Sequence, residues 1–352
     1  MPDDISKQLE RIREENGSPA LAAAVVDEGK IVALGASGFR NVRIPVPVTL
    51  EDKWHLGSCT KSMTASVVAM LVAMLVEEHK LSWGTTIGEI FPELGDRIEP
   101  GWLNVRVDQL LVHRGGAPAD PPAGLWKAAM AQRGSPTEQR YALVRGLLAR
   151  DPAYTAGARW VYSDCGYAIV GAIMERVSGE SWENLLRHRL FEPLGMTSAG
   201  FGPPSSMGQL DQPWGHRGYD APYVPVPPGL DADNPPAIGP AAAVHCTIAD
   251  FATYANWHVA GSIGECRLLK AESFKILHTP PPGQTYAMGW SVTKRRWAGG
   301  ITLMHNGENT MFYAVMWLGP GRNTAFVAAA NADSPDAQTA CDEAIRKLIN
   351  DY

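Results

Sequence analysis

The chain has 352 residues, of which 45% are hydrophobic and 19% are charged, and its formal net charge at pH 7 is −6. This length allows one large domain or two medium ones, and the composition is ordinary for a globular enzyme. The negative charge balance argues against a nucleic-acid partner, which would need a basic face. Five cysteines without a close pair indicate free thiols in a reducing compartment, and no Cys/His spacing predicts a zinc site.

The N-terminal residues and the most apolar segment indicate in which compartment of the cell the protein is expected. The apolar run Ser62–Val76 is shorter than the roughly 18 residues that a membrane helix needs, and it contains Ser and Thr, so no membrane span is expected. The first residues are strongly charged and predict an amphipathic helix rather than a signal peptide. We therefore expect a cytoplasmic protein, unless an N-terminal segment has been removed.

Strand-like and helical segments alternate along the chain in a clear order. After the N-terminal helix, the apolar runs 21–26 and 31–34 flank turn residues and predict a hairpin. Residues 62–78 contain no Gly or Pro and predict a buried helix. The segment 202–240 holds ten of the 27 prolines together with Trp214 and Tyr219, and it favours a long ordered loop. The remaining expected elements are helices at 166–178, 182–190, 248–259 and 337–350, and strands at 287–294, 301–305, 312–318 and 324–330.

Strands near both ends and helices between them predict an α+β fold. An antiparallel β-sheet would be built from both ends of the chain and flanked by the N- and C-terminal helices. We expect residues 1–80 and 248–352 to form this sheet domain. Residues 81–247 would form an inserted, mainly helical domain that includes the proline-rich loop 202–240.

Ser58 and Lys61 lie three residues apart near the start of the apolar helix, and residues with this spacing share one helix face. The amine is then within reach of the hydroxyl, and the helix dipole favours a developing alkoxide. This is the Ser-x-x-Lys arrangement of penicillin-recognising serine hydrolases. The same letters at Ser291 and Lys294 fall on an expected strand, where residues three apart face opposite sides. From the pattern alone, Ser58 is equally well interpreted as a nucleophile or as a helix N-cap.

Further segments extend the pattern over nearly the whole chain: Trp54–Ala65, Leu110–Pro118, Gly157–Gly179 and Phe191–Thr197. With them, the chain resembles the serine β-lactamase-related superfamily of class C β-lactamases, D-Ala-D-Ala carboxypeptidases and family VIII esterases. The resemblance implies a β-lactamase/transpeptidase-like fold and makes Ser58 the expected nucleophile.

The resemblance places the second motif of the family, Tyr-x-Asn, at Tyr162–Asp164. It implies that Tyr162 is a general base whose pKa is lowered by neighbouring cations. Tyr254-Ala255-Asn256 fits the letters better, but it lies inside an expected helix, so we interpret Tyr254 as a packing residue. Asp164 replaces the usual asparagine, and its carboxylate would hold Lys61 protonated. This replacement weakens the case for β-lactamase activity.

The third motif, Lys/His-x-Gly, falls on His305, Asn306 and Gly307, because the other His-x-Gly matches, at 113 and 216, do not end a strand. The resemblance implies that the N–H groups of Glu308 and Ser58 form an oxyanion hole, and that Gly307 lets the substrate approach the backbone. His305 stands in place of a lysine and can hydrogen-bond Tyr162 or help position a carboxylate. Asn306 replaces the usual threonine, which removes a hydroxyl that could hold a substrate carboxylate.

The implied mechanism is acyl transfer through a serine. Tyr162, coupled to Lys61, takes the proton of Ser58, which attacks a small ester or amide, and water then hydrolyses the acyl-enzyme. An esterase or amidase is favoured; a β-lactamase or D-Ala-D-Ala carboxypeptidase, an acyltransferase, and a non-hydrolytic acyl-sensor or scaffold remain open. Trp214 and Tyr219 are expected to line the pocket. No metal or organic cofactor is implied, the expected partner is a small-molecule substrate, and the oligomeric state is open.

Overall fold

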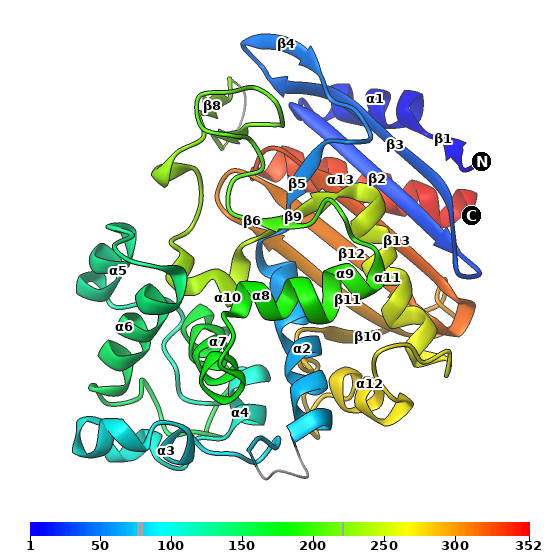
Figure 1. The fold of residues 1–352 in the computed structure, drawn as a ribbon. Helices are drawn as coiled ribbons and strands as arrows, with labels where there is room; N and C mark the ends of the chain where they lie inside the picture. The colour runs from blue at the N-terminus through cyan, green and yellow to red at the C-terminus, as the bar shows by residue number, and fades with distance from the viewer. Residues whose placement is uncertain (76–79, 220–221) are drawn as a thin grey trace.

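The computed structural model describes residues 1–75, 80–219 and 222–352 (Figure 1). Its main sheet has eight strands, in the order β1-β3-β2-β13-β12-β11-β10, with β4 paired to β3. All of these pairs are antiparallel except the short parallel pair β1–β3. The strands are β1 (Asp3–Asp4), β2 (Ala20–Asp27), β3 (Lys30–Asn41), β4 (Ile44–Pro47), β10 (Ser291–Arg295), β11 (Gly300–Glu308), β12 (Tyr313–Gly319) and β13 (Thr324–Ala330). The expected sheet built from both ends of the chain is confirmed.

Both faces of the sheet are covered, and the alternation of side chains along β2 shows how. Leu21, Ala23 and Val25 belong to the hydrophobic core under α1 (Ser6–Glu15) and α13 (Pro335–Asp351). Ala22, Ala24 and Val26 point into the larger core, where α11 (Ile248–Ser262) contacts β2 and β13. Because successive side chains of a strand face opposite sides, a strand this rich in Ala and Val packs against helices on both sides.

The remaining helices gather on one side of the sheet (Figure 1). The apolar helix α2 (Thr60–Leu75) contacts α7, α8, α10 and α12, so it is surrounded by other helices. The expected division of the chain at residues 80 and 248 stays a prediction. The helices of this region are α3 (Ile87–Ile90), α4 (Val107–Leu111), α5 (Ala123–Met130), α6 (Pro136–Leu148), α7 (Asp164–Ser178), α8 (Trp182–Leu186), α9 (Glu192–Leu194), α10 (Gly239–Ala242) and α12 (Ala271–His278).

The proline-rich segment 202–240 contains regular elements. Its strands β7 (Gly215–Arg217) and β8 (Val224–Val226) form a two-stranded ribbon. A second small sheet lies next to it in the order β5-β9-β6, formed by Lys53–His55, Val244–Thr247 and Gly200–Phe201. Strand β5 leads directly into the segment that carries Ser58, so this small sheet helps to place the site.

Three of the expected helices and strands begin or end at other residues in the structure. The strand expected from residue 287 begins at Ser291, because Gly289 adopts a left-handed conformation with φ +82°. The helix expected over 182–190 changes to a wider π turn after Leu186. The apolar helix expected to reach residue 78 is described as far as Leu75, and residues 76–79 lie outside the described part.

The expectation from the sequence that no segment is long and apolar enough to span a membrane is wrong: one helix meets both criteria. The helical stretch Gly57–Leu75 has 19 residues and a mean hydropathy of 1.5. In the fold, 78% of this stretch is buried, which is typical of the core helix of a globular protein.

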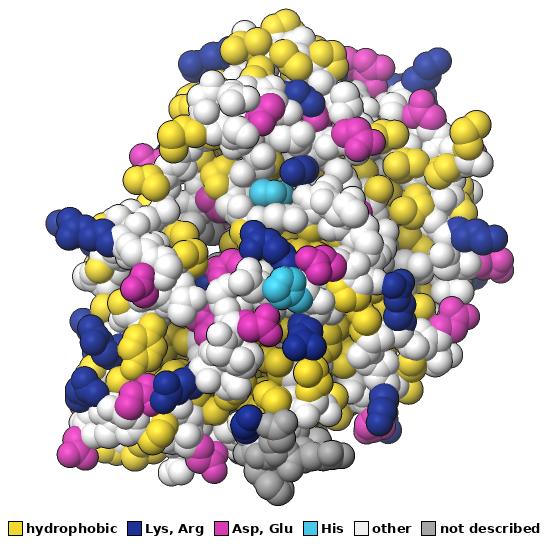
Figure 2. All heavy atoms as spheres, viewed as in Figure 1, with side chains coloured by type: hydrophobic (Ala, Val, Ile, Leu, Met, Phe, Trp, Pro, Cys, Tyr) yellow, Lys and Arg dark blue, Asp and Glu magenta, His cyan; other side chains and the backbone are white. Residues whose placement is uncertain are grey.

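Surface charges of both signs are mixed over the face shown in Figure 2. Lys and Arg side chains alternate there with Asp and Glu side chains and do not gather into one basic area. A surface of this kind lacks the basic stripe by which nucleic-acid-binding faces are recognised.

A buried arginine connects the helical region to the segment before α10. The Arg140 side chain is fully buried on α6 and forms ion pairs with Glu175 of α7 and Glu183 of α8. It also donates to the carbonyl of Pro236 at 3.2 Å. These bonds fix the approach of the segment that leads to Ala241.

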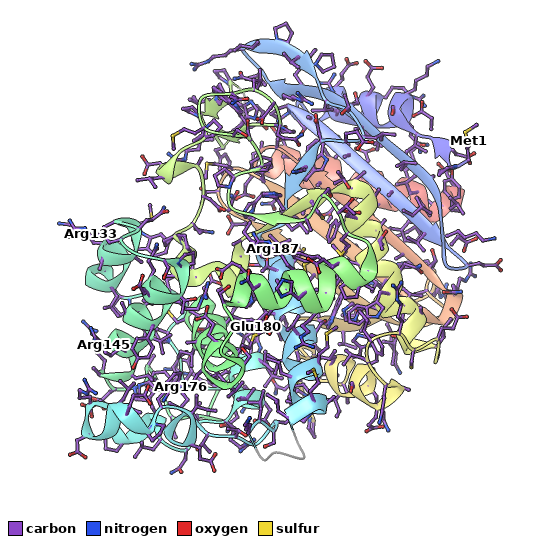
Figure 3. The ribbon with its side chains drawn as sticks, in the orientation of Figure 1. Met1, Arg133, Arg145, Arg176, Glu180 and Arg187 are labelled. Atoms are coloured by element: carbon purple, nitrogen blue, oxygen red, sulfur yellow. The ribbon has the colours of Figure 1, made fainter. Side chains whose placement is uncertain are left out.

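We expect Arg140→Ala to lower the free energy of unfolding by about 3–5 kcal/mol, because it leaves two carboxylates without their buried cation. Urea denaturation measures this change. Arg145→Ala is the matched control, since Arg145 lies on the exposed side of the same helix (Figure 3). An equal loss in both variants would contradict the assigned role of Arg140.

Candidate active site

Ser58 lies in a short 3₁₀ turn, Gly57–Cys59, that runs directly into α2. Lys61 follows one turn later, and its Nζ donates to Ser58 Oγ at 2.9 Å. The Lys61 side chain is fully buried. The structure therefore brings Ser58 and Lys61 together as predicted, whereas Ser291 and Lys294 lie on the strand β10.

The ammonium of Lys61 donates two hydrogen bonds and forms one ion pair. It donates to Ser58 Oγ and to the carbonyl of Ala241 at 3.1 Å, and it lies 2.6 Å from a carboxylate oxygen of Asp164. Burial by itself lowers the pKa of Lys61, but the negative charge of Asp164, with smaller contributions from Tyr162, outweighs burial, so its pKa is raised. Lys61 is thus a charged group at neutral pH, as the aspartate at position 164 predicts.

Tyr162 and Asp164 are placed by the start of α7. The Oγ of Ser163 caps this helix by accepting from the N–H of Gly166 at 2.9 Å. The Lys61 Nζ lies 4.5 Å from the centre of the Tyr162 ring. Burial raises the pKa of Tyr162, and the positive charge of Lys61, together with hydrogen bonds with Lys61 and Ser58, offsets only part of that effect. The expected net lowering of this pKa is therefore wrong: the cation does lower it, but desolvation of the phenolate is the larger effect.

His113 holds the backbone on both sides of Tyr162. Its carbonyl accepts from the N–H of Val161 at 3.0 Å, and its Nδ1 accepts from the N–H of Ser163 at 3.1 Å. Its ring lies 4.4 Å from the Tyr162 ring, centre to centre. The backbone of His113 is left-handed, with φ +59°, which is uncommon for a residue other than glycine. The sequence showed this histidine only as a rejected His-x-Gly match inside the family-like segment 110–118.

His305 lies on β11, and its partner is Tyr286 instead of Tyr162. The two side chains are joined at 2.9 Å through His305 Nε2, and His305 Nδ1 is 2.5 Å from the carbonyl of Asn306. A carbonyl only accepts, so Nδ1 carries the proton and Tyr286 donates to Nε2. Burial and the charge of Lys61 lower the pKa of His305 to about 3, which makes it a neutral group. No motif in the sequence pointed to Tyr286.

The N–H groups expected to form the oxyanion hole lie where the Ser58 turn meets the end of β11. A methyl group on Gly57, whose φ is +47°, would collide with the backbone nitrogen of Glu308. A methyl group on Gly307 would collide with the backbone nitrogen of Ser58. The two glycines therefore allow the backbones that carry the N–H groups of Ser58 and Glu308 to lie against each other, which such a hole requires.

A cavity of about 360 Å³ lies beside Tyr162 and the strand β11. It contains Tyr162, His305 and Asn306, and aromatic side chains of Trp160 and Tyr286 form much of its wall. No charged side chain is among the described residues that line it. Further lining residues are Gln284, Thr285 and Ser291.

Trp214 and Tyr219, which were expected to line the pocket, are not among the described residues of this cavity. Trp214 donates its indole N–H to the carbonyl of Gln209 at 2.8 Å, and Tyr219 is 80% exposed. Tyr254 is buried in α11 and donates to Ser62 at 2.9 Å, in agreement with its interpretation as a packing residue. Over the ranges 1–75, 80–219 and 222–352, no group of three or more His, Cys, Asp or Glu side chains could hold a metal ion.

This geometry is that of a Ser-x-x-Lys arrangement with a tyrosine beside it, and comparison with known proteins gives the family. Residues 5–349 match the family model described as Beta-lactamase, so the chain belongs to the beta-lactamase family. It is 27% identical to penicillin-binding protein 4 of Amycolatopsis lactamdurans, over 100% of this chain and 91% of that protein. It is also 27% identical to lovastatin esterase of Penicillium rubens, over 52% of this chain and 49% of that protein.

Among solved structures, the D-stereospecific amidohydrolase from Streptomyces sp. has a similar fold. Its TM-score is 0.72 at 21% identity, and the match covers 96% of this chain and 97% of that one. At this level of identity the similarity bears on the fold alone. It confirms the expected fold class over nearly the entire chain.

We expect His113→Leu to lower kcat/KM about 10- to 100-fold, because the Tyr162 backbone loses a side-chain acceptor that positions it. His113→Asn should lose less, since an asparagine oxygen can replace Nδ1 as acceptor and asparagine tolerates a left-handed backbone. Ester turnover per titrated active site measures both variants. Equal losses in the two would contradict a positioning role.

Buried neutral histidines should make the fold sensitive to acid. Burial lowers the pKa of His216 and His245 to about 4, and of His278 and His305 to about 3. Between pH 6.5 and about 4, the unfolded chain binds protons that the folded chain cannot, so stability falls as pH falls. Each histidine contributes up to about 1.4 kcal/mol per pH unit.

Denaturation curves at pH 7.5 and pH 5 test this dependence. His305→Gln should reduce it, whereas His188→Gln, at an exposed position, should leave it unchanged. A free energy of unfolding that is the same at both pH values would refute the effect.

Proposed function

We propose that this protein is a serine hydrolase that forms an acyl-enzyme on Ser58 with small uncharged or cationic esters or amides. The observation that carries the proposal is the bond between Lys61 Nζ and Ser58 Oγ at 2.9 Å, beside the closely packed backbones of Ser58 and Glu308. A positioned hydroxyl with a proton-transfer partner and two N–H donors is what acyl transfer through serine needs.

Proton transfer then differs from the route implied by the family. Tyr162 keeps its proton and Lys61 is an ammonium at neutral pH, because both pKa values are raised. Asp164, 2.6 Å from Nζ, is the acceptor that remains. Lys61 first passes a proton to Asp164, and the neutral amine that results takes the hydroxyl proton as Ser58 attacks. When the tetrahedral intermediate collapses, the proton returns through Lys61 to the leaving group.

The charges around the site favour substrates without a carboxylate. His305 is neutral, and Asn306 occupies the next position of the third motif. Partial burial, together with the negative charges of Asp333 and Asp164, raises the pKa of the Glu308 carboxyl, so acidic groups lie close to one another there. An anionic substrate would be repelled by them. This argues against β-lactams and D-Ala-D-Ala peptides, which carry a carboxylate.

The cavity beside the site suits an uncharged group of the substrate. Its aromatic walls, from Trp160, Tyr162 and Tyr286, offer apolar contact, and its amide and hydroxyl groups can orient a ligand. The names of the relatives, an esterase and a penicillin-binding protein, and of the amidohydrolase with the same fold support ester and amide substrates as a class.

A substrate panel tests the proposal. We expect turnover of nitrophenyl esters with neutral or cationic acyl groups, at least tenfold slower turnover of anionic ones, and no turnover of a chromogenic cephalosporin. A fluorophosphonate should label the peptide that contains Ser58, and Ser58→Ala should abolish both turnover and labelling. Rapid cephalosporin hydrolysis would support a β-lactamase instead. A stable Ser58 adduct without turnover would support an acyl-sensor.

Asp164→Asn separates the proton relay from a role in substrate attraction. If Asp164 accepts the proton, the variant should lose about 10- to 100-fold in kcat on neutral and cationic esters alike. A loss confined to cationic substrates would instead mean that Asp164 attracts an ammonium group and takes no part in proton transfer.

A further inference from the structure

The proline-rich segment supplies a buried carboxylate that is connected by hydrogen bonds to the residue before Ser58. The side chain of Asp233 is 6% exposed, and its Oδ2 is 2.9 Å from Nε2 of His55 on β5. Its Oδ1 accepts from Asn309 Nδ2 at 3.0 Å and from the N–H of Asn234 at 2.7 Å. Asp233 therefore joins two segments that are distant in the sequence, 178 and 76 positions away.

The first connection leads to the nucleophile. The N–H of Gly57 donates to His55 Nδ1 at 3.1 Å, so Nδ1 has no proton and the proton of the ring lies on Nε2. His55 is then a neutral donor to Asp233, with its tautomer fixed. Because Gly57 immediately precedes Ser58, this chain of bonds orients the peptide that presents the N–H of Ser58.

The second connection leads to the other backbone N–H. Asn309 immediately follows Glu308, and both the nitrogen and the oxygen of its side-chain amide form hydrogen bonds. Its Nδ2 donates to Asp233, while its Oδ1 accepts from the N–H groups of Met311 and Phe312 at 3.3 and 3.0 Å. This arrangement fixes the turn at the end of β11, directly after Glu308.

We propose that Asp233 is a positioning residue that holds the N–H groups of Ser58 and Glu308 at the spacing an oxyanion requires. We name Asp233, His55 and Asn309 the carboxylate clamp. This inference rests on the proposed hydrolase function and adds to it a role for the proline-rich segment that the sequence assigned to the pocket wall.

The burial of the clamp supports a role beyond stability. His55 is 0% exposed and Asn309 is 3% exposed, and the groups that donate to the carboxylate are an imidazole N–H, an amide and a backbone N–H. A buried charge is costly even when it is fully hydrogen-bonded, and apolar packing would often be at least as stable. A carboxylate is, however, the one side chain that only accepts, so it can receive donors from both segments at once.

Asp233→Asn tests the clamp because it changes the charge and almost no volume. Whichever way the new amide turns, its NH₂ faces another donor, either His55 or Asn309. We expect kcat for a neutral nitrophenyl ester to fall 10- to 100-fold while KM stays within threefold, because an oxyanion forms only after substrate has bound. Inactivation by a fluorophosphonate should slow by a similar factor.

Asn309→Asp alone places two carboxylates together and should also slow turnover. Combined in one protein, Asp233→Asn and Asn309→Asp again pair an amide with a carboxylate while His55 keeps an acceptor. We therefore expect the kcat of the double variant to be higher than the value obtained by multiplying the effects of the two single substitutions. Losses that simply multiply would overturn the clamp. Asp231→Asn, an exposed residue of the same segment, is the matched control and should retain full activity.

The readouts keep the two proposals apart. Rates are expressed per active site titrated with the fluorophosphonate, so a partly unfolded variant does not lower the apparent kcat. If the wild-type protein neither turns over esters nor is labelled on Ser58, the hydrolase function itself is wrong. If the wild-type protein is active and Asp233→Asn retains its kcat, or loses only thermal stability, the hydrolase function holds and the clamp is wrong.

Discussion

The site depends on one close contact, where the backbone of the Ser58 turn packs against the backbone at the end of β11. Gly57 and Gly307 make this contact possible, since a methyl group on either would collide with a backbone nitrogen of the other segment. The turn precedes α2, and β11 belongs to the main sheet. Their junction is therefore where the helical part of the molecule and the sheet combine into a single catalytic surface.

Around this contact, buried polar groups fix the position of each reacting atom. Asp164 and the carbonyl of Ala241 orient the Lys61 ammonium, and His113 orients the backbone beside Tyr162. These groups come from different parts of the chain, and each forms a hydrogen bond or an ion pair. Burying such polar groups costs free energy of desolvation, so their presence here indicates that the geometry of the site matters more than its stability.

The sequence predicted the parts of the site that follow local rules. Ser58 and Lys61 are one helical turn apart, and the effect of Asp164 on Lys61 follows from charge alone. The sheet built from both ends of the chain also followed from the strand-like runs near each end, but the order of its strands did not. Tyr286, His113 and Asp233 could not be predicted, because their partners lie 19, 50 and 178 positions away. The sign of the Tyr162 pKa shift was missed because sequence shows neighbouring charges but not the depth of burial.

The pairing of β2 with β13 joins residues about 300 positions apart in the middle of the sheet: Leu21 lies opposite Ala330. The strand that carries the second N–H group of the proposed oxyanion hole, β11, pairs with β12, which in turn pairs with β13. A growing chain that has emerged only as far as α12 already contains Ser58, Lys61 and Tyr162 but lacks the strands β10–β13, among them β11, against which the Ser58 turn packs. Such contacts between distant residues form late and slowly. If Ser58 is the nucleophile that we propose, its reactivity arises only with the last strands, and a nascent or truncated chain is expected to leave this serine inert.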